Sequence, residues 1–487
     1  MKTKSTYFAI TIAALFLCMT MPPFDCGAPS AQAALNVNNV NAQLRNGGDL
    51  WHNGSDARYI VPKVEPASGL PEVAALFAGA LWMGGIDPGG SLKLAAQTYG
   101  SFGGDSEYYA GPLDEVGSTD TENCSNFDRF WSTNKADIET HMADLADNAV
   151  IDGPIPESIA AWPGRLNPDF ESIHGFELPD YGYGFAPFFD QNGNGQYEPN
   201  DGDYPNINNA DQGEWTVFND SGNIHFNSGG DVLRMEIHLL AYSYVSASEA
   251  INNATFYDYT FVNKGVDSLD SLYFGLWVDP DLGCYTDDYI GCSPDHNMGF
   301  VYNKDATDGD TGCSCPGGVN TYCEDIPVVA FKILNGPKAE RVFGDNGELE
   351  IPQIGQVGDT IVDLGMTSFM YYNNGGFNPP PPPGTTDPQQ DVEFYRLLSG
   401  SWIDGTPLTE GGTGYNAGGV PISYAFPDNP SDVSGWSMSQ ENIANQDQRV
   451  VLGSGPTRMN PGQINTMTVA ILYKPSVPHP APDITCV

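Results

Sequence analysis

The segment TFYDYTFVNKGVDSLDSLYFGLWVD, residues 255–279, decides the fold class of this chain. Aromatic and β-branched residues alternate in part with polar ones at both of its ends, and Asn, Lys, Gly and Asp residues occupy its middle. These residue types favour strands at the ends and a turn between them. We therefore expect two antiparallel neighbouring strands of a β-sandwich.

Strand-like runs of the same kind recur along the chain and are separated by clusters of Gly, Asn and Asp. They lie at residues 232–245, 327–334 and 465–473. Fifty-six Gly and 38 Pro residues fit many turns and long loops. The sequence predicts a mainly β protein with one or more antiparallel β-sandwich-like domains, long Gly-, Pro- and Asp-rich loops and few short helices. Fewer than about a quarter of the residues should be helical.

The clearest helical pattern lies at residues 134–148. Ile138, Met142 and Leu145 recur at a spacing that places them on one face of a helix, beneath a polar outer face. His141, on the same helix, is expected to be an exposed polar residue.

The first 33 residues resemble a signal peptide. Lys2 and Lys4 give a positive start, residues 7–19 form a short apolar run, and Ala31-Gln32-Ala33 offers a cleavage site of small residues. No later segment reaches about 18 uninterrupted apolar residues, so we expect no membrane span. The sequence thus predicts a secreted protein or one on the outer cell surface.

The rest of the chain is expected to divide near residue 230. Its parts are an N-terminal β-rich region (34–230), a β-sandwich-like region (231–487), a Cys- and Asp-rich insertion (283–325), an exposed Pro-rich loop (373–391) and a second short helix (391–398).

Acidic residues dominate the charged ones. Sixty-two Asp and Glu residues against 19 Lys and Arg residues give a formal net charge of −43. Nucleic-acid phosphates would be repelled by this charge, so we expect no nucleic-acid partner. Such acidity serves solubility, and where the acids cluster it can also serve the ligation of divalent cations.

The segment DQNGNGQYEPNDGDYP, residues 190–205, has the ligand spacing of an EF-hand loop, with a glycine at its sixth position. Gly and Pro in its flanks oppose the helices that a calcium sensor needs, so a calcium-bound structural loop is predicted. The alternative is an ordinary turn rich in Asn and Asp. The expected ligands in residues 190–201 are Asp190, Asn192, Asn194, the carbonyl of Gln196, Glu198 and Asp201.

Two further acidic clusters are weaker candidates for calcium loops, with solvated turns as the alternative. The first contains Asp279, Asp281, Asp287 and Asp288. The second contains Asp305, Asp308 and Asp310.

Seven cysteines follow the expected cleavage site, and five of them lie in the insertion. In an exported protein this density predicts disulfides, with Cys284–Cys292 as the expected short closure. A zinc site is the disfavoured alternative, because CxC is not the usual knuckle spacing. The five cysteines are Cys284, Cys292, Cys313, Cys315 and Cys323. The odd total leaves one thiol unpaired, for which Cys486 is expected.

Signatures of catalysis are absent from the sequence. HExxH, GxSxG, a phosphate-binding loop and the dinucleotide glycine pattern do not occur in a suitable context, so the catalytic residues are unknown and an enzyme is disfavoured. Trp82, Trp215 and Trp277 lie in strand-like runs and are expected in the core. Trp51 and Trp162, beside turn residues, are better candidates for exposed platforms.

Several stretches together resemble a known group of proteins. They are LNVNNVNAQLRNGGDLWHNGSDARYIVPK, FAGALWMGGIDPGGSLKLAAQTYG, the 190–205 segment and YFGLWVDPDLGCYTDDYIGC, within residues 35–303. They are similar to the N-terminal region of large, mostly uncharacterised exported Bacteroidota proteins of the type IX secretion cargo type. The resemblance implies secreted or surface placement and supplies no catalytic residues. Such cargo ends in a C-terminal sorting domain, and none is evident here, which leaves open a truncated form or another export route.

Two functions are carried forward. The first is a secreted or cell-surface, calcium-stabilised β-rich protein with a non-catalytic adhesion or matrix role, contacting extracellular glycans or surface proteins. The alternative is a secreted hydrolase of the glycoside hydrolase type that uses paired carboxylates. The sequence does not set the oligomeric state.

Overall fold

The structure is a computed structural model that describes residues 26–486, apart from residues 101–103, 105, 345–346, 354–355, 377–378, 445–446 and 480. Strands make up 35% and helices 14% of the chain. The predicted mainly β fold with few short helices is therefore confirmed. Most of the expected signal peptide, residues 1–25, lies outside the described residues.

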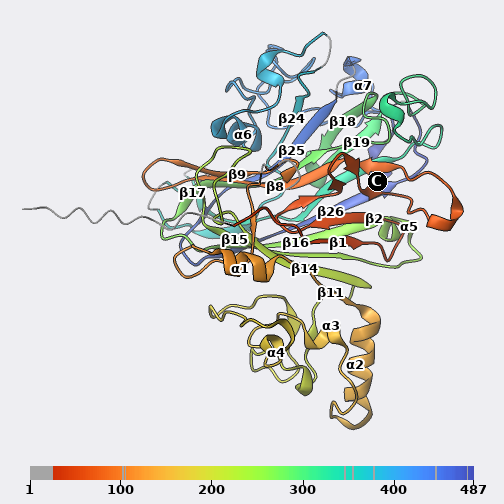
Figure 1. The fold of residues 1–487 in the computed structure, drawn as a ribbon. Helices are drawn as coiled ribbons and strands as arrows, with labels where there is room; N and C mark the ends of the chain where they lie inside the picture. The colour runs from red at the N-terminus through yellow and green to blue at the C-terminus, as the bar shows by residue number, and fades with distance from the viewer. Residues whose placement is uncertain are drawn as a thin grey trace, which may run out of the picture.

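Two large antiparallel sheets pack face to face around one continuous hydrophobic core (Figure 1). The first sheet contains, in spatial order, β24 (Ser368–Asn373), β25 (Gln448–Met459), β17 (Leu269–Asp279), β8 (Ala78–Ile86), β3 (Asp49–Leu50), β2 (Asn41–Arg45), β6 (Tyr59–Ile60) and β7 (Ala74–Leu76), with β1 (Gln32–Leu35) beside β2 and β9 (Leu92–Ala96) beside β8. The second contains β10 (Tyr109–Ala110), β14 (Gln212–Asn219), β15 (Met235–Ser243), β16 (Ala254–Asn263), β26 (Ile464–Lys474), β20 (Val328–Asn335), β19 (Met298–Asn303) and β18 (Asp288–Ser293), with β11 (Trp131–Asn134) beside β14. Strands from both sides of residue 230 contribute to both sheets, so the two expected regions share one sandwich.

The two strands of the opening segment do not pair with each other, which corrects the expectation that they are antiparallel neighbours. β16 pairs with β15 and β26, whereas β17 pairs with β8 and β25 in the other sheet. The rings of Phe261 and Phe274 stack across the core with their centroids 4.2 Å apart. Alternation of residues identifies which face of each strand is apolar, but it does not identify the strand's partner. Two strands can bury their apolar faces side by side in one sheet or opposite each other in two packed sheets.

The outer faces of the sheets are covered as well, which explains why β8 and β15 are buried along almost their whole length. Helix α6 (Asp391–Leu398) lies on the first sheet, where Phe394 contacts Trp82 with ring centroids 5.1 Å apart. A lobe below the second sheet covers β14 and β15 with its own hydrophobic cluster (Figure 1). Strands covered on both faces become apolar at nearly every position.

The lobe contains the helix expected at 134–148, which is α2 (Lys135–Asn148). Asn134 caps it by accepting a hydrogen bond from the Asp137 amide. The buried face differs from the expected one, because Ile138 and His141 are buried and Met142 is exposed. His141 Nε2 lies 3.1 Å from the carbonyl oxygen of Asp203, so this histidine joins the helix to the 190–205 loop.

The remaining elements are short. The other α-helices are α1 (Thr121–Phe127), α3 (Glu157–Ala160), α4 (Phe170–His174), α5 (Glu249–Asn252) and α7 (Met438–Glu441). Small sheets are formed by β4 (His52–Asn53) with β5 (Asp56–Ala57), by β12 (Phe188–Phe189) with β13 (Tyr204–Pro205), and by β21 (Lys338–Phe343), β22 (Leu349–Glu350) and β23 (Thr360–Asp363). The described 3-10 turns are η1 (Pro66–Ser68), η3 (Pro199–Asp201), η4 (Pro294–His296), η5 (Pro316–Gly318), η6 (Pro383–Thr385) and η7 (Ile484–Cys486).

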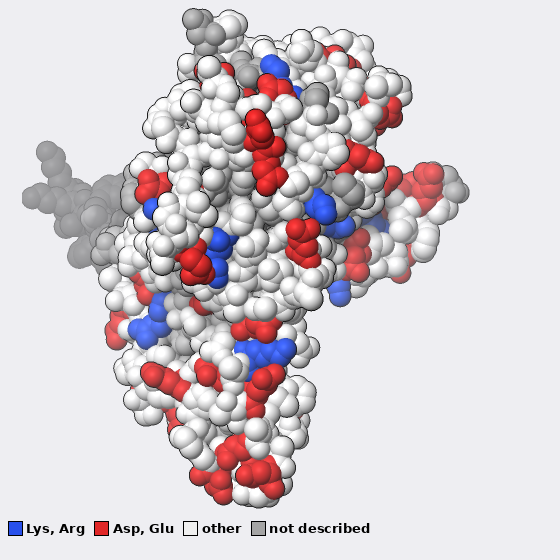
Figure 2. Space-filling model, turned by 90° about the vertical axis from the view of Figure 1, so that its right-hand side faces the viewer, with Lys and Arg blue, Asp and Glu red and all other residues white. Residues whose placement is uncertain are grey.

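The surface carries the acidic excess of the sequence. In Figure 2, Asp and Glu side chains spread over the visible face and gather at the tip of the lobe below the sandwich. Within the described residues, no helix is long and apolar enough to cross a membrane.

The described N-terminal residues belong to the folded body. Cys26 forms a disulfide with Cys124, and β1 pairs with β2 from Gln32 to Leu35. Cleavage after Ala33, as the sequence suggested, would remove Cys26 and divide β1.

We expect the mature chain to retain Cys26. N-terminal sequencing together with peptide mapping without reduction should recover a Cys26–Cys124 peptide, because burial of the pair keeps it intact. A mature chain that begins at Ala34, with Cys124 as a free thiol, would contradict this assignment.

His225 is a buried charge between the sheets. Its Nδ1 lies 2.6 Å from the Leu94 carbonyl oxygen and its Nε2 2.7 Å from that of Asp220, so both ring nitrogens must carry a proton. The carboxylates of Glu107 and Asp220 each lie 3.8 Å from the ring. Burial lowers the pKa of His225, but the two carboxylates and the carbonyls outweigh burial and raise the pKa above its usual value.

We expect this group to make stability fall as pH rises. A histidine with a raised folded pKa contributes stability that is complete below about pH 6.5 and is lost as pH rises through the folded pKa. Burial also raises the pKa values of Glu107 and Asp220, which gives the same sign. His225→Gln should lower the free energy of unfolding by about 3–5 kcal/mol at pH 6.

Urea unfolding at a series of pH values from 6 upward measures the loss of stability in the variant and the pH dependence of stability. The free energy of unfolding should decline less steeply with pH in His225→Gln than in the parent protein. His296→Gln, at an exposed position, is the control that should keep the parent's slope. An unchanged slope in His225→Gln would count against a buried imidazolium.

Candidate metal-binding pocket

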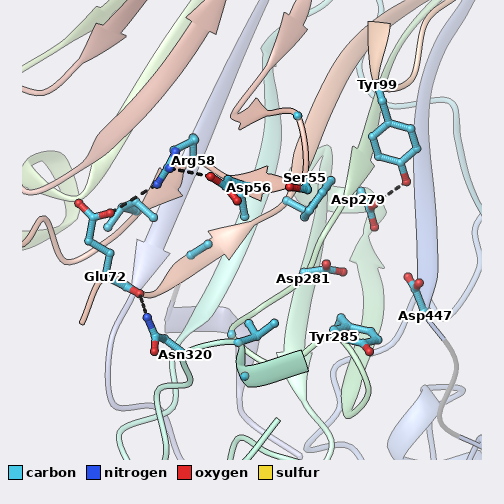
Figure 3. A pocket seen from close by; sticks show the side chains of 18 of the residues that line it. Ser55, Asp56, Arg58, Glu72, Tyr99, Asp279, Asp281, Tyr285, Asn320 and Asp447 are labelled. Carbon is cyan, nitrogen blue, oxygen red and sulfur yellow. Dashed lines mark hydrogen bonds and ion pairs between the residues drawn. The ribbon is translucent and has the colours of Figure 1, made fainter. Parts of the chain in front are cut away.

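A pocket of about 750 Å³ lies at one end of the sandwich, beside the ends of β17 and β25. Figure 3 shows Asp279, Asp281 and Asp447 on one side of it. On the other side Arg58 contacts Asp56 at 3.0 Å and Glu72 at 3.5 Å. The structure divides the expected insertion at 283–325, because β18 and β19 within it belong to the second sheet; from here on, the insertion means residues 304–325. It forms part of the wall through Gly318, Val319 and Asn320, and Gly283 and Tyr285, which precede β18, also line the pocket.

Strand register brings the three carboxylates together. Asp279 is the last residue of β17, and Asp447 immediately precedes β25. The pairing of Val278 with Val450, continued by one residue, places Asp279 opposite Arg449. Continued by two more, it places Asp281 opposite Asp447. One carboxylate oxygen of each of the three acids lies within 4.8 Å of those of the other two.

One guanidinium accompanies the three acids. Arg449 lies 3.4 Å from Asp279 Oδ2 and 2.6 Å from Asp447 Oδ1. The Tyr99 hydroxyl donates a hydrogen bond of 2.7 Å to Asp279 Oδ2. Asp279 Oδ1, on a side chain that is 2% exposed, has no hydrogen-bond partner among the described residues. Three carboxylates and one guanidinium leave two negative charges uncompensated.

This crowding makes ionisation of the acids unfavourable in the absence of a cation. Burial raises the pKa of Asp279 to about 6, and Arg449 offsets it only in part. Burial and the charges of Asp279 and Asp447 also raise the pKa of Asp281. A divalent cation between the carboxylates would supply the missing charge.

The donors favour a hard cation. All three groups offer carboxylate oxygens, which suit Ca²⁺, whereas Zn²⁺ in proteins prefers nitrogen and sulfur. Ca²⁺ takes about six to eight oxygen ligands, so three carboxylates leave positions that face the pocket. The site can therefore hold a cation and still accept oxygens from a bound molecule.

The acidic cluster that the sequence placed in one loop is divided between two sites. Asp279 and Asp281 line the pocket, whereas Asp287 and Asp288 lie toward the insertion. There Asp287 meets Asp308, and their carboxylate oxygens lie within 4.8 Å of each other and of Cys284 Sγ. Asp305 and Asp310, expected beside Asp308, are exposed.

Two disulfides hold the insertion, as the cysteine density predicted, but the expected Cys284–Cys292 pair is wrong. Cys284 pairs with Cys315, and Cys313 pairs with Cys323. Cys292 is a buried free thiol within β18, where its Sγ lies 3.3 Å from the Ala425 carbonyl oxygen. Burial of Cys292 in the core keeps it away from the insertion. The side chain of Cys486 lies outside the described residues.

The 190–201 loop forms a compact turn held by its own side chains. Asp190 accepts hydrogen bonds from the amides of Gly193 and Gly195, each at 2.6 Å. Asn194 Nδ2 donates to Glu198 at 2.5 Å, and Asn192 Nδ2 lies 3.4 Å from Asp201 Oδ2. This geometry fits an Asn- and Asp-rich turn, and calcium at the loop stays a prediction.

Asp201→Asn tests calcium at this loop. Without calcium the substitution should change the free energy of unfolding by less than about 0.5 kcal/mol, because it alters one long surface hydrogen bond. With calcium the variant should show a smaller rise in melting temperature than the parent, because one ligand is lost. Scanning calorimetry with calcium and with chelator measures both, and Glu177→Gln in the same lobe is the control. Equal calcium-dependent rises in melting temperature in the parent and both variants would exclude this loop as a calcium site.

Tryptophan side chains do not form exposed platforms. Trp82, Trp215 and Trp277 are in the core as expected, but Trp51 and Trp162, expected at the surface, are fully buried. Trp51 Nε1 donates to the Tyr257 hydroxyl at 2.8 Å, and Trp162 Nε1 to the Pro187 carbonyl oxygen at 3.0 Å. Turn residues beside a tryptophan therefore do not predict its exposure here.

The pocket contains residues that sequence reasoning missed. Tyr99, Asp447 and Arg449 carry no motif; strand pairing brings Asp447 and Arg449 to Asp279, and Tyr99 reaches it from the segment after β9. Knowledge that β17 pairs with β25 would have located Asp447 and Arg449.

Neither the protein-family models nor the curated proteins contain a match to this sequence. The function is therefore inferred from the geometry of the pocket.

Proposed function

We propose that this protein is a non-catalytic binding protein of the cell exterior, which holds Ca²⁺ in the pocket and binds glycan hydroxyls through it. The observation that supports the proposal is the convergence of Asp279, Asp281 and Asp447, with an unpartnered carboxylate oxygen, in an open pocket. Calcium is the cation that such oxygen donors favour outside cells.

Placement outside the cytoplasm is supported by three disulfides, because such bonds persist in oxidising compartments. The resemblance to exported Bacteroidota proteins points the same way. Type IX secretion is the export route that the resemblance implies.

Glycans suit the pocket because its walls combine aromatic and polar groups. Phe77 and Tyr285 offer partly exposed rings that can stack on sugar faces. Arg58, Glu72 and Asn320 offer donors and acceptors for hydroxyl groups (Figure 3). Adjacent hydroxyls of a sugar can fill the coordination positions of calcium that face the pocket.

Hydrolysis of glycans is supported less well. A glycoside hydrolase needs one protonated carboxyl group and one free carboxylate. Arg449 forms ion pairs with both Asp279 and Asp447, which favours the charged form of each. One oxygen each of Asp279, Asp281 and Asp447 lies within 4.8 Å of the others, an arrangement that suits a shared cation.

Asp281→Asn tests the proposal, because it removes one charged ligand and retains the size of the side chain. Calcium affinity at the pocket should fall by at least about tenfold, or about 1.4 kcal/mol. Titration calorimetry of chelator-treated protein measures the affinity. A glycan array, read with calcium and with chelator, should show calcium-dependent binding that the variant loses.

Asp363→Asn, at an exposed position in β23, is the matched control and should leave both readouts unchanged. Unaltered calcium binding by Asp281→Asn and Asp447→Asn would exclude the pocket as a cation site. Turnover of a polysaccharide that either variant abolishes would instead establish the hydrolase alternative.

A further inference from the structure

A second group of buried acids lies where the insertion meets the hairpin of β18 and β19. Asp287 immediately precedes β18, and Asp308 lies in the insertion. Their side chains are 3% and 0% exposed, with carboxylate oxygens within 4.8 Å of each other. Cys284 Sγ lies equally close, but its disulfide with Cys315 removes it as a thiolate ligand.

Both oxygens of Asp308 accept hydrogen bonds from backbone amides, those of Cys284 and Tyr322, whereas Asp287 has one oxygen without such a donor. Asp287 Oδ2 accepts a hydrogen bond of 2.8 Å from the Gly309 amide, and Asp308 Oδ1 one of 2.8 Å from the Cys284 amide. Among the described residues, Asp287 Oδ1 and Asn303 Oδ1 have no hydrogen-bond partner. Burial raises the pKa of Asp287, and the fully buried side chain of Asn303, which adjoins Asp287, lowers the pKa of that carboxyl group in part by hydrogen bonding. Unpartnered buried oxygens are costly and rare in folded proteins.

Asp288 adds a third carboxyl group beside Asp287 and Asp308. Asp288 opens β18 directly opposite Asn303, and its Oδ1 also has no hydrogen-bond partner in the described chain. No Lys, Arg or His of the described residues forms an ion pair with Asp287, Asp288 or Asp308. Buried like charges without a counter-ion are strongly unfavourable.

We propose that a second Ca²⁺ ion binds here, with ligands from Asp287, Asp308 and Asn303 Oδ1, while Asp288 adds negative charge beside them. The donors are oxygens held close together, which selects a hard cation over zinc. This ion would fasten the insertion to the β18–β19 hairpin.

The site also orders the pocket wall. Gly283, Tyr285 and Asn320 line the pocket, and they flank the segments that carry Asp287 and Asp308. Gly283 has a φ of +74°, and a Cβ atom there would lie 2.0 Å from Asp308 Oδ2. The close approach of position 283 to Asp308 therefore requires glycine. The proposal of a second ion does not depend on glycan binding in the pocket.

Asp287→Asn tests the proposal, because its melting temperature relative to the parent should change sign between chelator and calcium. The amide oxygen can still accept from the Gly309 amide, while the negative charge beside Asp308 is removed. In chelator the variant should therefore melt at or above the temperature of the parent. With calcium it should melt below the parent, because the parent gains an ion that the variant lacks.

Native mass spectrometry separates this ion from the one in the pocket. Asp287→Asn should lose one calcium ion and keep the pocket ion, Asp281→Asn should do the reverse, and Asp310→Asn, exposed in the insertion, should keep both. Digestion with proteinase K should cut the parent's residues 304–322 about tenfold faster in chelator than in calcium, whereas the rate for Asp287→Asn should be the same in chelator and in calcium.

Two results would overturn the proposal. One is an Asp287→Asn protein with the parent's calcium count and calcium-dependent melting shift. The other is an Asp287→Asn protein that melts above the parent by the same amount with and without calcium, which would assign a shared proton in place of the ion.

Discussion

Between β17 and β18 the chain crosses from one sheet to the other at one end of the sandwich, and carboxylates lie on both sides of the crossing. Asp279 and Asp281 meet Asp447 in the pocket, whereas Asp287 meets Asp308 beneath the insertion. Within the described residues, Arg449 is the guanidinium that forms ion pairs with Asp279 and Asp447. Repulsion at this end must be relieved by cations or protons before the pocket and insertion can keep their geometry.

The fold class was accessible from the sequence because burial selects residue types strand by strand. The runs predicted at 232–245, 327–334 and 465–473 correspond to β15, β20 and β26. The helix expected at 391–398 is α6. The partners of each strand were not accessible, since an apolar face can be buried against a neighbouring sheet or helix alike. Thus β16 and β17, adjacent in sequence, face each other across the core.

Local sequence patterns failed to predict the burial of side chains whose contacts come from a distant segment of the chain. His141 seemed a surface residue because its own helix offers it no partner, and the carbonyl of Asp203 supplies one. Trp51 is followed by turn residues, yet Tyr257 of the opposite sheet buries it. The acidic cluster at 279–288 was found as a cluster, but its division into two sites depends on Asp447 and Asp308, which only the tertiary fold brings near.

The proposed ions and the disulfides have complementary roles. Cys284–Cys315 and Cys313–Cys323 limit the insertion in the unfolded chain, but they do not relieve the charge of Asp287 and Asp308 in the folded one. A cation relieves that charge and contributes only when the ligands are already close. Both contributions require the cell exterior, where thiols oxidise and calcium is abundant enough for weak sites. In the proposed placement outside the cell, both contributions act on the same stretch of chain, because Cys284 and Cys315 bracket Asp287 and Asp308 in the sequence.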